Sequence, residues 1–175
     1  MTRHASAATS ETGASARPGH PVPDPIRFLH GAWQLTKLGR DSVPGRTMRY
    51  CGQARFSSMA TGLLFEERGT VSVGAYLGEA TRRYVFHIQS DGTAEVCFEN
   101  GTFFHHLNLG SGGAHVWHNC VTDRYEGCYR VLGPDCWIVS WRVTGPRKRQ
   151  VISSRFIRKV TVSNGRDDPS CRPAR

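Results

Sequence analysis

The chain has 175 residues, 38% of them hydrophobic, and carries a formal net charge of +9, with 23 Lys and Arg against 14 Asp and Glu. This length suits one well-buried domain and excludes two of ordinary size. No apolar stretch could span a bilayer and the basic residues are scattered, so neither a membrane nor a nucleic acid is predicted as a partner.

Both ends of the sequence have the composition of disordered tails. Residues 1–25 are rich in Ala, Ser, Thr, Gly and Pro, and residues 163–175 have the same character. Such segments bury too little apolar surface to offset their conformational entropy. The predicted folded domain therefore covers residues 26–162.

The six cysteines are predicted to be reduced thiols in a cytoplasmic protein. The N-terminal tail lacks the apolar run of a secretory signal, and disulfide frameworks belong mainly to secreted proteins. No two cysteines have the CxxC spacing of a structural zinc site.

Along the chain, one short helix is followed only by strand signals. Asp24 as N-cap and Pro25 at the first helical position predict a helix over 24–29. After it, short alternating runs rich in Val, Ile, Phe, Tyr and Trp are separated by Gly, Pro, Asn and Asp turns. These runs predict strands near residues 32–38, 48–57, 63–72, 81–89, 94–99, 102–109, 113–120, 125–132, 136–144 and 150–160.

About ten consecutive strands joined by short turns predict an all-β fold. An up-and-down antiparallel meander of this kind avoids exposed edges most simply by closing on itself. We therefore predict a single closed antiparallel β-barrel, monomeric or weakly dimeric. A barrel of eight to ten strands can hold one small ligand in its interior.

Gly31-x-Trp33 on the first strand and Arg158 on the last resemble the signature of lipocalin-like (calycin) barrels, in which the arginine packs across the tryptophan and closes one end. More specifically, the chain resembles a lipocalin-like family of unknown function found in bacteria and plants. The resemblance implies the fold and brings no established activity. Asn108 stands where that family more usually has an acid. The matching segments are 28–33, 100–105, 118–125, Trp137, Trp141 and 145–148.

Several polar residues stand on otherwise apolar stripes. In a strand, residues two apart share a face. Phe103, His105, Leu107 and Leu109 form one such stripe, and His118 shares another with Val116 and Cys120. Because ionisable groups facing a core are unfavourable without partners, these stripes predict a cavity with a polar lining.

The motif His118-x-Cys120-x-x-Asp123-x-Tyr125 has three interpretations. Asp123 could orient the His118 tautomer while Tyr125 donates to a developing oxyanion, which gives acid–base catalysis with His105 nearby. The imidazole and thiolate could instead bind a metal. Thirdly, the motif could be a hydrogen-bonded turn, with His105 a satisfied core histidine.

The predicted function is binding of a small hydrophobic or aromatic ligand, anionic or neutral, in the barrel. Two alternatives remain open: an isomerase, cyclase or lyase that needs no cofactor, and a haem or metal protein with His105 or His118 as the ligand. The catalytic candidates are His118, His105, Asp123 and Tyr125, and no metal site or cofactor is assigned. The ligand-binding candidates are Trp33, Tyr84, Trp137, Trp141, Arg158 and Cys120.

Overall fold

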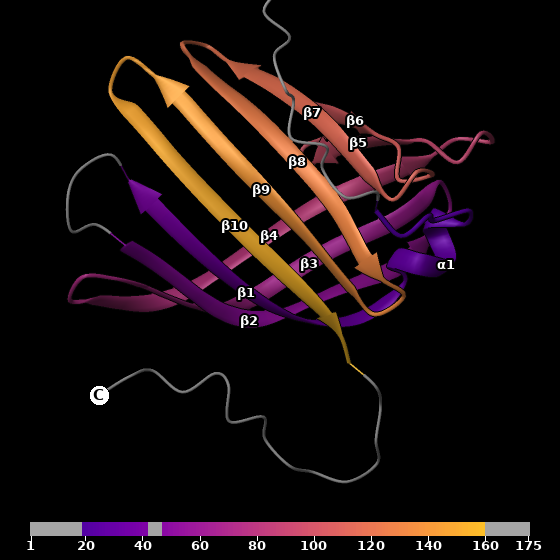
Figure 1. Cartoon of the computed structure of the whole chain (residues 1–175), viewed down its shortest axis with the longest axis horizontal. Helices are drawn as coiled ribbons and strands as arrows, with labels where there is room; N and C mark the ends of the chain where they lie inside the picture. The colour runs from indigo at the N-terminus through magenta and orange to yellow at the C-terminus, as the bar shows by residue number, and fades with distance from the viewer. Residues whose placement is uncertain (1–18, 42–46, 160–175) are drawn as a thin grey trace, which may run out of the picture.

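A computed structural model describes residues 19–41 and 47–159 (Figure 1). It has one short helix, α1 (Pro25–Leu29), which is the helix that the sequence predicts. No helix in the described part of the chain is long and apolar enough to cross a membrane. The strands are β1 (Gly31–Asp41), β2 (Thr47–Met59), β3 (Gly62–Val73), β4 (Tyr76–Ile88), β5 (Ala94–Phe98), β6 (Phe103–Leu107), β7 (Gly113–Cys120), β8 (Asp123–Gly133), β9 (Cys136–Gly145) and β10 (Lys148–Arg158).

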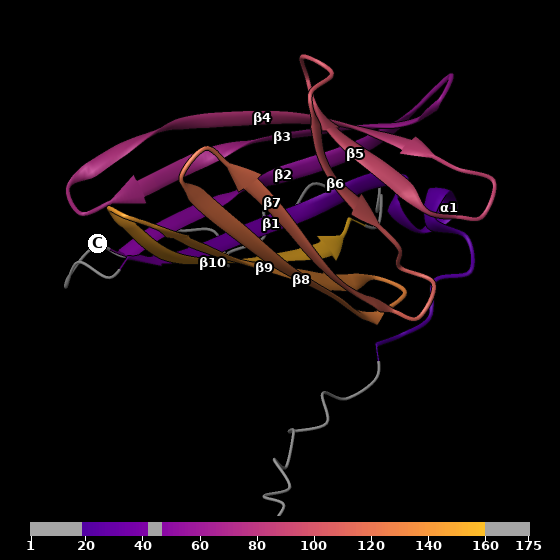
Figure 2. The ribbon, with the colours of Figure 1, turned by 90° about the horizontal axis from the view of Figure 1, so that it is seen from above.

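The strands form one antiparallel sheet in the order β6-β5-β4-β3-β2-β1-β10-β9-β8-β7. Strands that follow one another in sequence pair, except β6 and β7, and β1 also pairs with β10, so the meander curls into a barrel. Figure 2 shows β3 and β4 on one side of the interior and β8, β9 and β10 on the other. The predicted all-β barrel of ten strands is confirmed.

The barrel has a seam between β6 and β7. No strand pairing joins these two edges among the described residues. Side chains cross the seam instead: Nδ1 of His118 donates to the carbonyl oxygen of Phe104 at 2.9 Å, and the Tyr129 hydroxyl lies 3.1 Å from Nε2 of His105. The sheet is therefore nearly closed.

The helix covers one end of the barrel, which we call the closed end. Asp24 caps the helix by accepting from the Arg27 amide at 2.9 Å, and Leu29 accepts from Nε1 of the fully buried Trp33 at 2.8 Å. The guanidinium of Arg158 lies 4.2 Å from the Trp33 ring centroid and donates to the carbonyl oxygen of Phe28 at 2.6 Å. The predicted contact between Trp33 and Arg158 is confirmed.

The N-terminal boundary of the domain lies earlier than predicted. His20 donates its amide to Val131, and the buried Val22 donates to Gly110. These hydrogen bonds pin residues 19–25 against the barrel, so the prediction that disorder extends to residue 25 is wrong. The rest of the predicted tails, residues 1–18 and 163–175, lies outside the described residues.

A β-bulge changes the predicted orientation of one aromatic residue. The register between β5 and β6 shifts after Val96, so Phe104 is the extra residue of its strand. Phe103, predicted to face inward, is exposed, whereas Phe104 and His105 are both buried. A bulge breaks the alternation of side chains, which is why two successive residues reach the interior.

The prediction of reduced cysteines holds at four of the five cysteines in the described residues. Cys97, Cys120, Cys128 and Cys136 are free thiols. Cys51 is disulfide-bonded, so the prediction of a reduced thiol is wrong at that position.

Candidate functional site

The inward-facing stripes change from apolar to polar toward the end of the barrel away from α1, which we call the open end. On β1, buried Trp33 and Leu35 are followed two residues later by Lys37, and on β3 buried Leu63 and Phe65 are followed by Glu67. Five inward-facing residues form what we call the inner polar cluster: Lys37, Tyr50, Glu67, Arg82 and Tyr84.

Lys37 and Glu67 form an ion pair that is largely shielded from solvent. The Lys37 ammonium lies 2.5 and 2.7 Å from the two carboxylate oxygens, and the side chains are 13% and 6% exposed. The pair reaches across β2 at Gly52, which is paired with Gly69 so closely that a Cβ on Gly52 would lie 2.6 Å from the Gly69 Cα. The absence of side chains at this glycine pair leaves room for the Tyr50 ring, whose hydroxyl lies 2.8 Å from the position that a Cβ on Gly52 would take.

Tyr50 lies beside this ion pair. The Lys37 ammonium is 4.8 Å from the Tyr50 ring centroid, and the Tyr50 hydroxyl is buried with no hydrogen-bond partner among the described residues. Burial raises the pKa of Tyr50, and the Glu67 carboxylate raises it further. Burial also lowers the pKa of Lys37, against the opposing effect of Glu67. Tyr50 therefore stays protonated and can act as a hydrogen-bond donor.

Arg82 is the cation of the cluster that solvent reaches. It pairs in register with Glu67, and its Nη1 donates to the Tyr84 hydroxyl at 3.2 Å. It makes no ion pair within the described residues, since Lys37 occupies both oxygens of Glu67. Burial acts to lower the pKa of Arg82, but Tyr84, Glu67 and, from the opposite wall, Tyr125 outweigh that effect and raise it.

The opposite wall carries a second polar group. Lys148, at the start of β10, donates to the Tyr125 hydroxyl at 3.2 Å, and its ammonium lies 3.8 Å from Oδ2 of Asp123. Tyr125 is half-buried on β8. Arg82 and Lys148 thus place positive charge on both walls of the open end.

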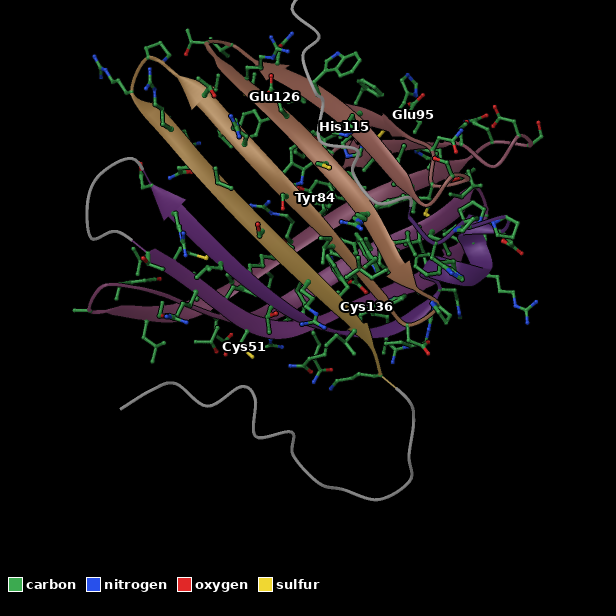
Figure 3. The ribbon with its side chains drawn as sticks, in the orientation of Figure 1. Cys51, Tyr84, Glu95, His115, Glu126 and Cys136 are labelled. Carbon is green, nitrogen blue, oxygen red and sulfur yellow. The ribbon has the colours of Figure 1, made fainter. Side chains whose placement is uncertain are left out.

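Aromatic rings line the interior next to the inner polar cluster. Tyr84 stacks on Phe104 with ring centroids 5.5 Å apart, and Phe104 stacks on Trp141 at 5.1 Å. Tyr84 and Trp141 are only half-buried, so part of each ring is accessible. His115 and Glu126, labelled with Tyr84 in Figure 3, are by contrast exposed.

A family model described as "Family of unknown function (DUF6314)" matches residues 29–158. The chain belongs to this family. The match runs from the last residue of α1 to the last residue of β10, so DUF6314 corresponds to the whole barrel. No curated protein matches the sequence.

Two solved structures share the fold of this DUF6314 barrel. The S-type phycobiliprotein lyase CPES from Guillardia theta superimposes with a TM-score of 0.58 at 7% identity, covering 78% of this chain and 92% of that chain. A DUF3598 protein of unknown function from Nostoc punctiforme gives 0.55 at 12% identity, covering 81% of this chain and 51% of that chain, so the match spans about half of that protein's length. These likenesses show a lipocalin-like barrel, as the sequence predicts.

Within the DUF6314 barrel, His105 has every ring nitrogen engaged. Its Nδ1 lies 3.1 Å from the His106 carbonyl oxygen, which can only accept, so Nδ1 carries the proton and Nε2 accepts from the Tyr129 hydroxyl. Burial lowers the pKa of His105 to about 4. His105 is therefore a neutral, fully bonded core residue at pH 7.

His118 and Asp123 are not joined in the way the catalytic interpretation requires. Nδ1 of His118 donates to the Phe104 carbonyl oxygen, and Asp123 pairs with Lys148, which is the hydrogen-bonded arrangement of the third interpretation more than the acid–base one. The His118 ring lies 6.2 Å from Tyr125. His105 and His118 both pack against Phe104, at 4.7 and 5.1 Å, without a hydrogen bond or ring contact between them in the described structure.

The ligand-binding candidates fall into two groups. Tyr84 and Trp141 line the accessible interior, and Trp137 lies deeper, stacked on Phe156 at 3.8 Å with a buried Nε1 that has no partner among the described residues. The others do not reach this interior. Trp33 and Arg158 are used at the closed end, and Cys120 is exposed at the tip of the β7–β8 hairpin, where no neighbouring strand covers it.

No group of three or more His, Cys, Asp or Glu that could hold a metal ion occurs among the described residues. The sequence interpretation also missed the Lys37–Glu67 pair and Arg82. The signal was present: Lys37 and Glu67 each continue an apolar stripe with a period of two, the pattern used to select His105.

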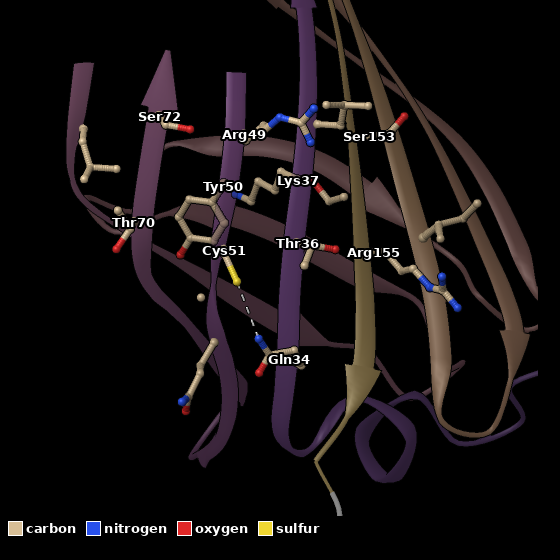
Figure 4. Close-up of a pocket in the computed structure, with 16 residues that line it drawn as sticks. Gln34, Thr36, Lys37, Arg49, Tyr50, Cys51, Thr70, Ser72, Ser153 and Arg155 are labelled. Carbon is tan, nitrogen blue, oxygen red and sulfur yellow. Dashed lines mark hydrogen bonds between the residues drawn. The ribbon is translucent and has the colours of Figure 1, made fainter. Parts of the chain in front are cut away.

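A groove of about 970 Å³ lies on the outer face of the sheet (Figure 4). Most of its lining residues face away from the interior, as the burial pattern of β1 and β2 shows. Nε2 of Gln34 donates to Sγ of Cys51 at 3.8 Å along this groove. The unpartnered Tyr50 hydroxyl and the half-buried rings of Tyr84 and Trp141 lie on the inward-facing stripes instead. Two residues of the inner polar cluster, Lys37 and Tyr50, also line this groove. The other residues labelled in Figure 4 include Thr36, Arg49, Cys51, Thr70, Ser153 and Arg155.

The neutral state of His105 predicts a pH dependence of stability. The unfolded chain binds a proton near pH 6.5, but the folded chain binds it only near pH 4. The contribution of His105 is therefore complete above pH 6.5 and is lost as the pH falls toward 4, by on the order of 3 kcal/mol. Urea unfolding of wild type and His105→Gln between pH 7 and 4 measures it. A stability difference between the two proteins that stays constant over this range would contradict the assignment.

Proposed function

We propose that this protein binds a small apolar or aromatic molecule with an acidic group, which enters the barrel from the open end. Arg82 is the observation that carries the proposal. It is a solvent-accessible cation on an inward-facing position, and no described acidic side chain pairs with it. A carboxylate held by a guanidinium gains charge-assisted hydrogen bonds, which are stronger than neutral ones.

The aromatic lining supports a flat apolar ligand body. Tyr84 and Trp141 each expose part of a ring and are linked through Phe104 into a continuous stack. A ligand placed over them would bury apolar area on both sides, the usual composition of a small-molecule site.

Two buried polar atoms support an occupied interior. The Tyr50 hydroxyl and Nε1 of Trp137, both on inward-facing stripes, have no partner among the described residues. Buried polar groups nearly always form hydrogen bonds, and each unsatisfied one calls for a partner such as water or a ligand. Acceptor groups on a bound molecule would satisfy both donors.

Catalysis and haem binding stay predictions. The phycobiliprotein lyase is named as an enzyme and shares the fold, but a shared fold does not transfer chemistry. In this chain His105 is fully bonded and Asp123 is engaged by Lys148. Binding therefore has the stronger structural support.

The experiment compares two fluorescent probes that differ by one acidic group. 1-Anilinonaphthalene-8-sulfonate is anionic, and N-phenyl-1-naphthylamine is its neutral counterpart. We expect Arg82→Gln to weaken binding of the sulfonate roughly tenfold or more, with little effect on the neutral probe, because only the sulfonate contacts the guanidinium.

Arg83→Gln is the matched control. Arg83 is the next residue on β4, and it pairs with Glu66 and Glu99 on the outer face, with its side chain 53% exposed. This variant has the same change of charge and should bind both probes as wild type does. If both variants lost the same affinity for the sulfonate probe, the overall charge of the protein would account for binding, and Arg82 would have no specific role. Failure of wild type to bind either probe would overturn the proposal.

A further inference from the structure

The most exposed large apolar side chains lie on two hairpins, β3–β4 and β7–β8, whose turns are at the open end on opposite walls of the barrel. Tyr76, Leu77, Trp117 and Val121 are 60%, 64%, 66% and 100% exposed, whereas the other exposed large apolar side chains of the described residues range from 37% to 47%. Tyr76 and Leu77 follow the β3–β4 turn, and Trp117 and Val121 belong to the β7–β8 hairpin. Figures 1 and 2 both place these turns at the same end as the β9–β10 turn. Single exposed apolar residues need no explanation, but a collection at one end does.

A valine at position 121 is unfavourable for two reasons, its backbone conformation and its exposure. Its φ is 54°, in the left-handed region where a β-branched residue is an outlier. It is also fully exposed and gains nothing from packing. Local backbone stability therefore does not account for a valine at this hairpin tip. Residues held in such conformations concentrate at functional surfaces.

Unpaired positive charge lies beside the β7–β8 hairpin, on β9, β10 and the turn between them. The β9–β10 turn and its neighbourhood carry Arg142, Arg147 and Arg149, which are exposed and form no ion pair within the described chain. Three of the acids near this end already pair with a cation, Glu79 with Arg68, Asp123 with Lys148 and Glu126 with Arg124, and Asp41 accepts from the Gln150 amide at 3.2 Å. The basic cluster in the sequence thus belongs to the same end as the exposed apolar residues.

We propose that this rim docks on an anionic phospholipid surface. The rim consists of Tyr76, Leu77, Trp117, Val121, Arg142, Arg147 and Arg149.

Tryptophan, tyrosine and aliphatic side chains enter the interfacial layer of a bilayer, while arginines around them bind anionic headgroups. The sequence predicts no membrane partner because no segment of the chain could span a bilayer. Docking on the surface of a bilayer does not require such a segment. On the proposed function, the open end would then face the bilayer from which an apolar ligand enters.

The test is sedimentation of the full chain with vesicles. Wild type should bind vesicles of phosphatidylcholine with a minority of phosphatidylglycerol, but not vesicles of phosphatidylcholine alone, and added salt should weaken binding. Leu77→Ser/Val121→Ser should reduce binding roughly tenfold at unchanged charge. Arg147→Gln/Arg149→Gln should reduce it by roughly the same factor or more.

Leu132→Ser/Ile157→Ser is the matched control, since both residues are exposed apolar side chains at the closed end, at 47% and 44%. It should bind vesicles as wild type does. No binding of wild type to anionic vesicles, or equal losses in the rim and control variants, overturns the proposal. The proposal is also overturned if the protein binds heparin or RNA as tightly as it binds vesicles and if Leu77→Ser/Val121→Ser leaves that affinity unchanged. Probe binding in vesicle-free buffer reports the interior site separately.

Discussion

Replacing Trp33 by alanine should lower the free energy of unfolding by about 3–5 kcal/mol, the range for deleting a large buried aromatic side chain. Trp33 is fully buried between Phe28 and Trp137, with ring centroids 5.7 and 6.2 Å away. The substitution also removes the ring on which Arg158 lies and leaves the Leu29 carbonyl without its donor. Denaturant unfolding measures the loss.

Trp117→Ala is the matched control for this prediction. Trp117 is 66% exposed on β7, so its removal should change the free energy of unfolding by about 0.5 kcal/mol or less. If Trp33→Ala were as mild as Trp117→Ala, Trp33 would not organise the closed end, and the lipocalin-like signature would have no structural role in this chain.

The strands could be predicted from the sequence because their determinants are local. Alternation sets each strand, and turn residues set each boundary. Gly101 and Gly112 illustrate this, with φ of 82° in both cases, a conformation that glycine adopts without strain. Consecutive antiparallel strands joined by such turns leave few topologies, so the barrel follows from the same signals.

The bulge at Phe104 could not be predicted in this way. A period of two assigns Phe103 and His105 to one face and Phe104 to the other, but the register shift after Val96 puts Phe104 inside. A single extra residue in one strand leaves no mark in composition. It is visible only once the pairing with β5 is known.

The site was predicted in part for a related reason. Tyr84, Trp141 and Tyr125 could be placed inside from their own stripes. The Lys37–Glu67 pair depends on the distance across β2, which the sequence does not give. Asp123 and His118 are five residues apart in sequence, but the β7–β8 hairpin pairs His118 with Tyr125. Asp123 therefore lies nearer the tip of the hairpin, where its carboxylate forms an ion pair with Lys148.

Replacing Lys37 by methionine should destabilise the fold by about 3–5 kcal/mol, because Glu67 would stay buried as a charge without its partner. The Glu67 side chain is only 6% exposed, and both of its oxygens contact the Lys37 ammonium. Urea unfolding at pH 7 measures the loss. Arg68→Met is the matched control, since the Arg68–Glu79 pair also joins a basic residue to a glutamate on the same sheet, but with side chains 76% and 75% exposed. Breaking that pair should cost about 0–1 kcal/mol.

The double variant Lys37→Met/Glu67→Gln distinguishes two causes of the destabilisation in Lys37→Met, the unpaired charge of Glu67 and the lost packing of the lysine side chain. Removing both charges should recover most of the stability lost in Lys37→Met, since a neutral amide is far less costly to bury than a lone carboxylate. If the double variant were as unstable as the single one, the lysine would act through packing of its methylenes against Tyr50. Recovery, together with weakened binding of the anionic probe, would mean that the ion pair serves the ligand site more than the stability of the barrel.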